Sequence, residues 1–230
     1  DDCLHELNQS TRVAVISADQ SKDQLVAAHR SGRIRPLRPV FDLADDLVNE
    51  STHVVAQMGV EPILSALDQR AEIVVAGRCY DPAVFAAVPI RSGFPEALAL
   101  HMGKILECAA IAAVPGSGSD CMLGTLTHDN FVLEPLNPER RCTVTSVAAH
   151  TLYEKSDPRY LPGPGGTLDL TQCEFEAVDA RRVRVSGTKF IVDTPYRVKL
   201  EGAGPIGFRT ISIAGVRSPD FIGSLDAILE

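Results

Sequence analysis

Long apolar runs are missing from this sequence of 230 residues. No run approaches the roughly 18 residues that a membrane-spanning helix needs, and no basic region followed by an apolar one marks a signal peptide at the N-terminus. Lysine and arginine form no cluster with interleaved aromatic residues, and the formal net charge is −8, whereas nucleic-acid-binding proteins usually carry basic patches. We therefore expect a cytoplasmic protein that binds neither membranes nor nucleic acid.

Motifs for metals and nucleotides are missing as well. The six cysteines include no C-x-x-C pair, so they fit neither a zinc site nor a dense disulfide framework, and free thiols are expected. The glycine-rich stretch 161–167 is not followed by the Gly-Lys-Ser/Thr of a P-loop, and a nicotinamide fingerprint is absent. A reaction without metal or cofactor is the simpler expectation, with coenzyme A entering only as part of a substrate. Because the chain also lacks an initiator methionine, we expect a processed product or a fragment of a longer protein.

The first half has the pattern of an α/β fold. The apolar runs at 12–17 and 73–76 predict buried strands. Between them, helices are expected at 21–32, where residues 21–24 form a capping box and Gly32 ends the helix, at 41–49, and from Pro62 onward. Two prolines make 33–39 an extended connector. Continuous apolar strands separated by helices are typical of a partial parallel sheet with helices covering both faces.

The first region continues with helices expected at 82–88 and 96–113. From Pro115 the texture changes, with a flexible loop at 116–119 and a helix at 145–155. Period-two apolar spacing predicts antiparallel strands at 182–186, 196–201 and 207–214, and apolar positions at 220–230 predict a final helix. The expected organisation is an α/β region over 1–115 and a mixed region with antiparallel strands over 116–230. Whether the two regions share one core is left open.

A candidate ligand site lies in the turn at 77–82, directly after the strand at 73–76. In open α/β sheets this is where ligands bind, and the amides of a new helix favour an anion. Gly77 and Arg78 would hold a carboxylate or phosphate, with Asp81 as a titrating group. Cys79 would be a nucleophile if Arg78 lowers its pKa. The alternatives are an ion pair between Arg78 and Asp81 and a cysteine that only packs.

Two helices and one loop add further candidates. Lys104 is three residues before Glu107 and four before Cys108, so their side chains can meet on a helix, either as a reactive patch or as a solvated ion pair. His150 and Glu154 are four residues apart, which would let the carboxylate orient the imidazole for acid-base work, or form a structural pair.

The loop at 161–167 places Gly163, Gly165 and Gly166 where backbone can approach a ligand closely, or where it makes a rigid corner.

Six ordered segments within residues 55–217 carry a resemblance to a known family. They include Gly-Arg-Cys-Tyr-Asp-Pro at 77–82 and Arg-Thr-Ile-Ser-Ile-Ala-Gly-Val-Arg at 209–217, with the others at 99–108, 145–156, 163–170 and 199–203. These segments resemble the acyclic terpene utilisation AtuA family. The resemblance implies a place in the breakdown of citronellol- and geraniol-type compounds through CoA thioesters, and a shared site that contains Arg78, Asp81, Glu107, Cys108, His150 and Glu154.

Two departures from the family pattern affect these expectations. The chain begins after the N-terminal strand-helix portion that family members carry, so part of the parallel sheet is expected to be missing. Many members have Gly-His where this chain has Gly103 and Lys104, so a catalytic role does not carry over to Lys104 unchanged.

Two functions follow. The first is a cofactor-free enzyme that acts on a small carboxylate or its acyl-CoA thioester next to a carbonyl. The second is a non-catalytic binding or assembly subunit beside a CoA-dependent enzyme, in a homo- or hetero-oligomer.

Overall fold

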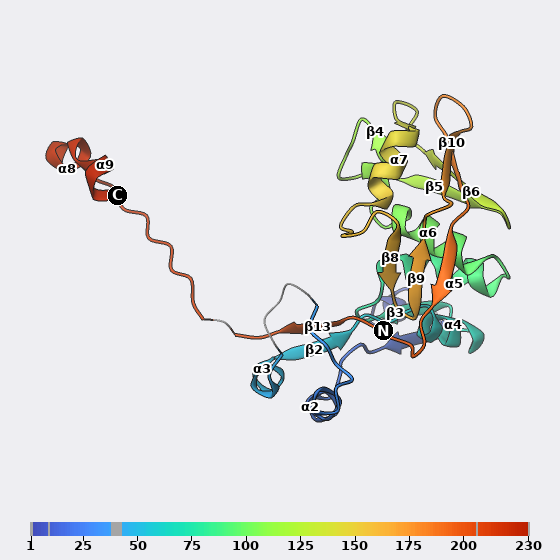
Figure 1. Ribbon diagram of the computed structural model, residues 1–230, viewed down its shortest axis with the longest axis horizontal. Coiled ribbons are helices and arrows are strands. Elements are labelled where there is room, and N and C mark those ends of the chain that lie inside the picture. Colours follow the sequence, from blue (N-terminus) through green and yellow to red (C-terminus); the bar gives the residue numbers. More distant parts are fainter. Residues whose placement is uncertain (1, 9, 38–42, 206, 230) are drawn as a thin grey trace.

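The computed structural model describes residues 2–8, 10–37, 43–205 and 207–229. Figure 1 shows the arrangement of the elements. The helices are α1 (Asp2–Glu6), α2 (Lys22–Arg30), α3 (Asp45–Glu50), α4 (Glu61–Asp68), α5 (Asp81–Arg91), α6 (Glu96–Leu106), the 3₁₀ helix η1 (Ala109–Ala112), α7 (Val144–Thr151), α8 (Pro219–Gly223) and α9 (Leu225–Leu229). The strands are β1 (Val13–Ile16), β2 (His53–Ala56), β3 (Ile73–Ala76), β4 (Ala113–Val114), β5 (Met122–Leu126), β6 (Asn130–Pro135), β7 (Arg141–Cys142), β8 (Tyr160–Gly163), β9 (Gly166–Asp169), β10 (Glu174–Ala177), β11 (Val183–Ser186), β12 (Lys189–Val192) and β13 (Leu200–Ala203).

The parallel part of the fold is a pair of strands. β1 and β3 run parallel in a register from Val13 opposite Ile73 to Ile16 opposite Ala76, which confirms both predicted strands. One face packs into the protein, where Ile16 contacts the core beside α4. The other face is open, since Val15 is 78 % exposed and Val75 is 53 % exposed. The expectation of helices on both faces is therefore wrong.

Antiparallel sheets make up the rest, and the α/β fold class with a mixed antiparallel region is confirmed. One sheet has the order β10-β11-β6-β5 and another has the order β12-β9-β8, while β4 pairs with β7. β2, which the sequence pattern did not predict, pairs with β13. Isolated bridges join Asp19 to Val55 and Met58 to Cys79, so the chain around β2 crosses the carboxyl ends of β1 and β3.

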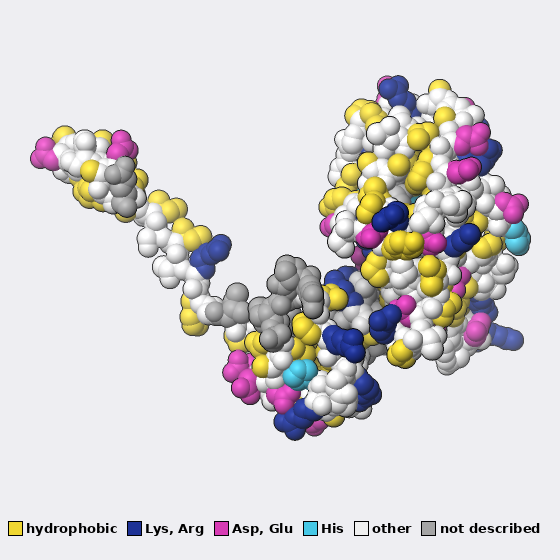
Figure 2. All heavy atoms as spheres, viewed as in Figure 1, with side chains coloured by type: hydrophobic (Ala, Val, Ile, Leu, Met, Phe, Trp, Pro, Cys, Tyr) yellow, Lys and Arg dark blue, Asp and Glu magenta, His cyan; other side chains and the backbone are white. Residues whose placement is uncertain are grey.

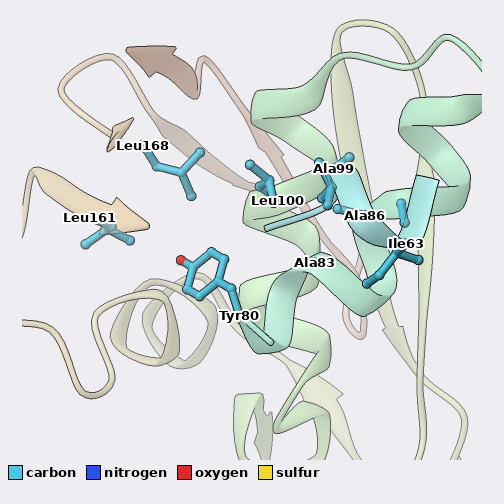
Figure 3. Packing of buried hydrophobic residues seen from close by; sticks show 10 residues of the cluster. Ile63, Tyr80, Ala83, Ala86, Ala99, Leu100, Leu161 and Leu168 are labelled. Atoms are coloured by element: carbon cyan, nitrogen blue, oxygen red, sulfur yellow. The ribbon is translucent and has the colours of Figure 1, made fainter. Parts of the chain in front are cut away.

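Helix α6 lies between two apolar clusters. Ala99 and Leu100 belong to a cluster with residues of α4, α5, β8 and β9 (Figure 3). On its other side, Leu98, Met102 and Ile105 belong to a cluster with residues of β6, β11 and α7. Every residue from 98 to 105 is buried. The helix is therefore a central element of the fold, and its polar residues His101 and Lys104 are buried with the apolar ones.

Close contact between α5 and α6 depends on a glycine. A Cβ atom added at Gly103 would stand 2.5 Å from the carbonyl oxygen of Pro82, which is backbone and does not move aside cheaply. The absence of a side chain at this position lets the start of α5 lie directly against α6. Both predicted site segments, the turn before α5 and the end of α6, are brought together by this contact.

Several predicted helix ends are corrected. α6 ends at Leu106 instead of 113, and the chain continues as the tighter 3₁₀ helix η1, in which the Ile111 amide donates to the Cys108 carbonyl at 3.0 Å. α5 runs on to Arg91, past the expected end at 88. α2 forms as expected and ends before Gly32, with φ of +70°, but the Ser21 side chain makes no cap hydrogen bond.

The predicted helix at 41–49 is present as α3, and residues 38–42 lie outside the described residues. The helix expected at 145–155 is α7, which starts at a capping box between Thr143 and Ser146 and ends at Thr151. The division into 1–115 and 116–230 stays a prediction, although one apolar cluster combines residues from both ranges.

The C-terminal segment is the largest departure from the prediction. After β13 the chain runs away from the body to α8 and α9 (Figure 1). The strand expected at 207–214 is wrong, because this segment pairs with no described strand. The strand expected at 196–201 begins only at Leu200, and the final helix is split in two. All described residues from 207 to 229 are exposed.

His101 on α6 is a buried histidine with a complete set of partners. Its Nε2 lies 3.1 Å from Thr151 Oγ1, whose own proton is donated to the Val147 carbonyl, so Nε2 must be the donor. Its Nδ1, 2.7 Å from Thr188 Oγ1, then accepts. Burial lowers the pKa of His101 to about 3. The imidazole is therefore neutral and structural.

This burial predicts a pH dependence of stability. The folded-state pKa of His101 lies below the unfolded value, so the unfolded chain binds more protons between them, and stability falls as the pH drops through 6.5 toward 3. We compare the free energy of unfolding of the unchanged chain with that of His101→Gln. The difference between the two should become smaller by about 2 kcal/mol between pH 7 and pH 5, because only the unchanged chain loses the contribution of His101. Urea denaturation measures it. For the control His128→Gln, at an exposed position, the difference in unfolding free energy from the unchanged chain should be the same at pH 7 and pH 5. If the difference changes equally with pH in both variants, His101 is not a buried neutral histidine.

Candidate functional site

The turn from Gly77 to Asp81 is held at the carboxyl end of the parallel strands. The Gly77 amide donates to the Ile16 carbonyl at 2.8 Å, and an added Cβ would lie 3.0 Å from the Ala18 amide nitrogen. The Tyr80 amide donates to the Met58 carbonyl at 2.9 Å. Gly77 is therefore needed for the close passage of two chain segments, and the turn presents Arg78 and Asp81 at the start of α5.

Arg78 is engaged by two carboxylates. Its Nε donates to Glu201 Oε2 at 2.8 Å and its Nη2 to Glu201 Oε1 at 3.3 Å, while Nη1 lies 3.2 Å from Asp81 Oδ1. The hydrogen bonds from Lys199 and Arg78 lower the pKa of Glu201. The ion pair with Asp81 was the sequence's alternative to a ligand site, and the forked contact with Glu201 of β13 was not foreseen. An anionic ligand at Arg78 would have to compete with both carboxylates.

Cys79 does not have the electrostatics of an activated thiol. Burial raises its pKa, and the charge of Asp81 adds to this, while Arg78 opposes it only in part. The nucleophilic role expected of Cys79 requires the opposite shift. Cys108 behaves in the same way, since burial and the charge of Glu107 raise its pKa against the effect of Lys104.

Lys104 and Glu107 form an ion pair away from solvent. Lys104 is 2 % exposed, its Nζ binds Glu107 Oε1, and it lies 5.8 Å from the ring centroid of Tyr153. The solvated ion pair that was the alternative is thus a buried one. Burial raises the pKa of Glu107 although Lys104 opposes this, so the carboxyl group can hold a proton more readily than an exposed glutamate.

His150 is brought into the same place by α7. Its ring stacks on Tyr153 with centroids 5.7 Å apart, and burial, together with the charge of Lys104, lowers its pKa. The ring also lies near the backbone of Ile105, which raises the pKa of His150 and so opposes part of this effect. The contact does not have the geometry of a hydrogen bond. His150 is 3 % exposed, and neither ring nitrogen has a hydrogen-bond partner among the described residues.

The predicted pairing of His150 with Glu154 does not form. α7 ends at Thr151, and Glu154 follows in a turn with φ of +60°, so the two residues no longer share a helix face. Glu154 is exposed and lies against Tyr153, raising the pKa of that phenol. The imidazole is positioned by stacking instead of by a carboxylate.

Tyr80 and Lys155 belong to the site but were missed by sequence reasoning. Tyr80 is 8 % exposed, and its Oη has no partner in the described part of the chain. Figure 3 shows its hydroxyl turned toward the side of Leu161. Lys155 Nζ lies 5.4 Å from the Tyr80 ring centroid. Both residues stand inside the segments that carry the family resemblance, 77–82 and 145–156, and that position was the signal available.

These residues form one polar cluster: Tyr80, Lys104, Glu107, His150, Tyr153 and Lys155. Burial raises the pKa of Tyr80, and the charge of Glu107 raises it further. Burial and the charge of Lys104 lower the pKa of Lys155, while the charge of Glu107 opposes this. Asp81 adjoins the cluster, since its charge helps to raise the pKa of Tyr80 and of Glu107. The structure therefore brings His150, Glu107 and Asp81 near one another and keeps the expected contact of Glu107 with Lys104, but it separates His150 from Glu154.

The glycines of the 161–167 segment make room for aromatic rings. The segment is a hairpin of β8 and β9 that turns at Pro164 and Gly165. An added Cβ would stand 3.0 Å from the Tyr80 ring at Gly163, 2.5 Å from the Tyr196 ring at Gly165, and 2.5 Å from the Phe190 ring at Gly166. The segment forms a tightly packed corner in which Gly163 borders the cluster through Tyr80, and a ligand contact at these glycines stays a prediction.

Two open hollows lie away from the cluster. One of about 550 Å³ is lined by β1 and α4, and one of about 410 Å³ by α2 and its surroundings, and neither is lined by a cluster residue. Neither has an acid-base group beyond an arginine. In the part of the chain that the structure describes, no three His, Cys, Asp or Glu side chains are grouped to hold a metal ion. Among the same residues, no helix is long and apolar enough to cross a membrane.

The fold and site define an α/β protein with a half-buried acid-base cluster at the carboxyl end of a parallel strand pair. The sequence model of the acyclic terpene utilisation family, AtuA, matches residues 1–116 and 130–221. The chain therefore belongs to the AtuA family, which confirms the resemblance. No curated protein and no solved structure matches it.

The buried hydroxyl of Tyr80 makes a testable prediction about stability. Because Oη has no partner in the described residues, Tyr80→Phe should leave the free energy of unfolding unchanged or raise it by up to about 1 kcal/mol. Tyr196→Phe is the matched control, since its hydroxyl donates to Glu61 at 2.9 Å and its loss should cost about 1 kcal/mol. Urea denaturation compares them. A clear loss of stability in Tyr80→Phe would mean that the hydroxyl is already bonded.

Proposed function

We propose that this chain is an enzyme of acyclic terpene utilisation that acts on a small carboxylate or its acyl-CoA thioester, by acid-base chemistry next to a carbonyl and without a cofactor. Family membership supports the metabolic context. The observation that carries the enzymatic part is the presence of buried polar atoms that have no partner among the described residues. These atoms are Tyr80 Oη and both ring nitrogens of His150, and they lie beside two lysines and a glutamate.

Unpartnered buried polar atoms support a ligand site for an energetic reason. A buried donor or acceptor without a partner costs roughly 1–3 kcal/mol, so proteins rarely keep one unless it has another use. A carbonyl or carboxyl oxygen that reaches Tyr80 Oη or His150 would satisfy that atom and recover this cost. Ligand binding at the cluster would thus be favourable.

The roles within the proposal follow from the pKa directions. His150, whose pKa is lowered by burial and by Lys104, is neutral at pH 7 and suits a general base. Glu107, whose pKa is raised by burial, suits a group that holds and returns a proton. Asp81 stays a second titrating candidate and Arg78 an anion-binding candidate, the latter only if Glu201 gives way. The cytoplasmic location expected from the sequence stays a prediction.

A melting-curve screen tests the proposal. The purified chain is melted with coenzyme A, with short and branched acyl-CoA thioesters, and with the matching free acids. A ligand at 100 times its dissociation constant should add about 2.7 kcal/mol of stability. Tyr80→Phe should lose most of this gain because it removes a contacting hydroxyl, whereas Tyr196→Phe should keep it.

The pattern across ligands and variants decides between outcomes. A gain with the thioester but not with the acid would assign the substrate as acyl-CoA, and a gain lost in Arg78→Ala would place the carboxylate or phosphate at the turn. A cooperative melt that no ligand shifts would overturn the enzymatic proposal.

The C-terminal arm, residues 207–229, favours a second candidate function. It exposes Phe208, Ile211 and Ile213, the last at 96 %, and further apolar residues on α8 and α9 (Figure 2). An extended segment with apolar side chains and unpaired backbone is suited to adding a strand to another chain. The alternative is therefore a binding or assembly subunit that works beside a CoA-dependent enzyme.

Truncation after Pro205 tests this alternative. Because no described residue of the arm is buried, the shortened chain should melt within about 2 °C of the full one, as expected for a change below 1 kcal/mol. If the arm assembles copies of the chain, sedimentation should show a larger species for the full chain than for the truncated one. Ile211→Ser with Ile213→Ser should weaken the association at unchanged length. Equal sedimentation of full and truncated chains would count against assembly through the arm.

A further inference from the structure

Within the described part of the chain, Lys155 differs from the cations around it in having no acidic partner. Arg78 is held by Glu201, Lys104 by Glu107, and Lys199 Nζ lies 2.8 Å from Glu201. For Lys155, no carboxylate of the described residues lies within ion-pair distance, although its side chain is partly buried. Its ammonium group instead faces the ring of Tyr80, with Nζ 5.4 Å from the centroid.

Burial and a neighbouring cation make the charged form of Lys155 less favourable than that of an exposed lysine. Lys155 lies just after α7, where its backbone amide donates a hydrogen bond to the Leu152 carbonyl. Its side chain reaches the ring of Tyr80 at the start of α5. Burial lowers its pKa, and the nearby charge of Lys104 adds to that, with Glu107 opposing in part. A lysine that is desolvated and next to a second cation is the arrangement by which proteins make an amine nucleophilic.

We propose that Lys155 is a nucleophile that captures the carbonyl carbon of a small ketone or aldehyde as an imine. This rests on the proposed function, because it assigns the substrate class and the bond-forming group of the same cluster. It goes beyond general acid-base chemistry by giving the site a covalent step.

The step balances without any further reactant. The lone pair of Lys155 Nζ forms a bond to the carbonyl carbon, and the carbonyl oxygen takes up a proton to give a carbinolamine. The carbon-oxygen bond then breaks, the oxygen leaves as water, and the nitrogen has given up both of its amine protons. The buried Tyr80 hydroxyl, part of the ring that faces Nζ, is available to donate to the carbonyl oxygen during the attack. Glu107 can hold the proton that the departing oxygen needs.

Borohydride trapping tests the proposal on the full chain. The protein is mixed with acetoacetate, or in a second arm with 3-methylbut-2-enal, and sodium borohydride then reduces any imine to a stable secondary amine. Peptide mass mapping locates the adduct. We expect the label predominantly on Lys155, with the exposed Lys189 of β12 labelled several-fold less. Labelling by one probe alone assigns the carbonyl class as keto acid or as aldehyde.

Variants separate this proposal from the proposed function. Lys155→Met should abolish the specific adduct and Lys189→Met should retain it; a melting curve of each reports whether the fold is kept. Because the map of the unchanged chain already locates the label, the test holds even if Lys155→Met is unstable. Equal labelling of Lys155 and Lys189, or no label, overturns the imine. If acids or thioesters still shift the melting curve in that case, the proposed function stands without it.

Discussion

The contact between Gly103 and Pro82 is the constraint on which the arrangement of the site depends. It lets the first turn of α5 touch the backbone of α6, and a single methyl group at Gly103 would stand 2.5 Å from the Pro82 carbonyl oxygen. With the helices this close, Asp81 at the start of α5 lies near Glu107 after the end of α6. The same contact places Tyr80 against the apolar cluster of both helices. Local backbone geometry, rather than attraction between charged groups, thus assembles the polar cluster.

Burial of α6 on all sides explains why its polar residues divide into two kinds. His101 is matched by Thr151 and Thr188 and is neutral, so it stabilises the packing between α6, α7 and the strands. Lys104 is matched by one carboxylate, which keeps a charge pair inside at the expense of desolvation. His150, packed against this end of α6, has no matching partner among the described residues. Since the protein satisfies one buried histidine fully and leaves the other unsatisfied, the second is the better candidate for contact with a ligand.

The sequence predicted the local part of this structure and missed the distant part. β1, β3, the turn at 77–81 and the ion pair of Arg78 with Asp81 follow from periodicity and from i, i+3 spacing. The forked contact of Arg78 with Glu201 spans 123 positions, and no local pattern announces it. α6 gives way to the 3₁₀ helix η1, and α7 ends at Thr151 in turns held by local hydrogen bonds, such as that from the Lys155 amide to the Leu152 carbonyl. The early end of α7 separated His150 from Glu154. The segment at 207–214 has the alternation of a strand, yet a strand also needs a neighbouring edge, which alternation alone does not supply.

The cations at the site differ in whether a bound ligand would have to break an ion pair. A carboxylate that binds Arg78 must displace Glu201 or Asp81, and one that binds Lys104 must displace Glu107 from a buried pair, so the displaced acid becomes unpaired in either case. A neutral carbonyl group that approaches Lys155 displaces no carboxylate of the described residues and meets an unpartnered hydroxyl on Tyr80. The net charge of −8 acts in the same direction, because it repels free anions from the protein as a whole. The electrostatics are therefore those that the proposed imine requires, namely an uncharged carbonyl as the reacting group, with any carboxylate or phosphate held outside the buried pair.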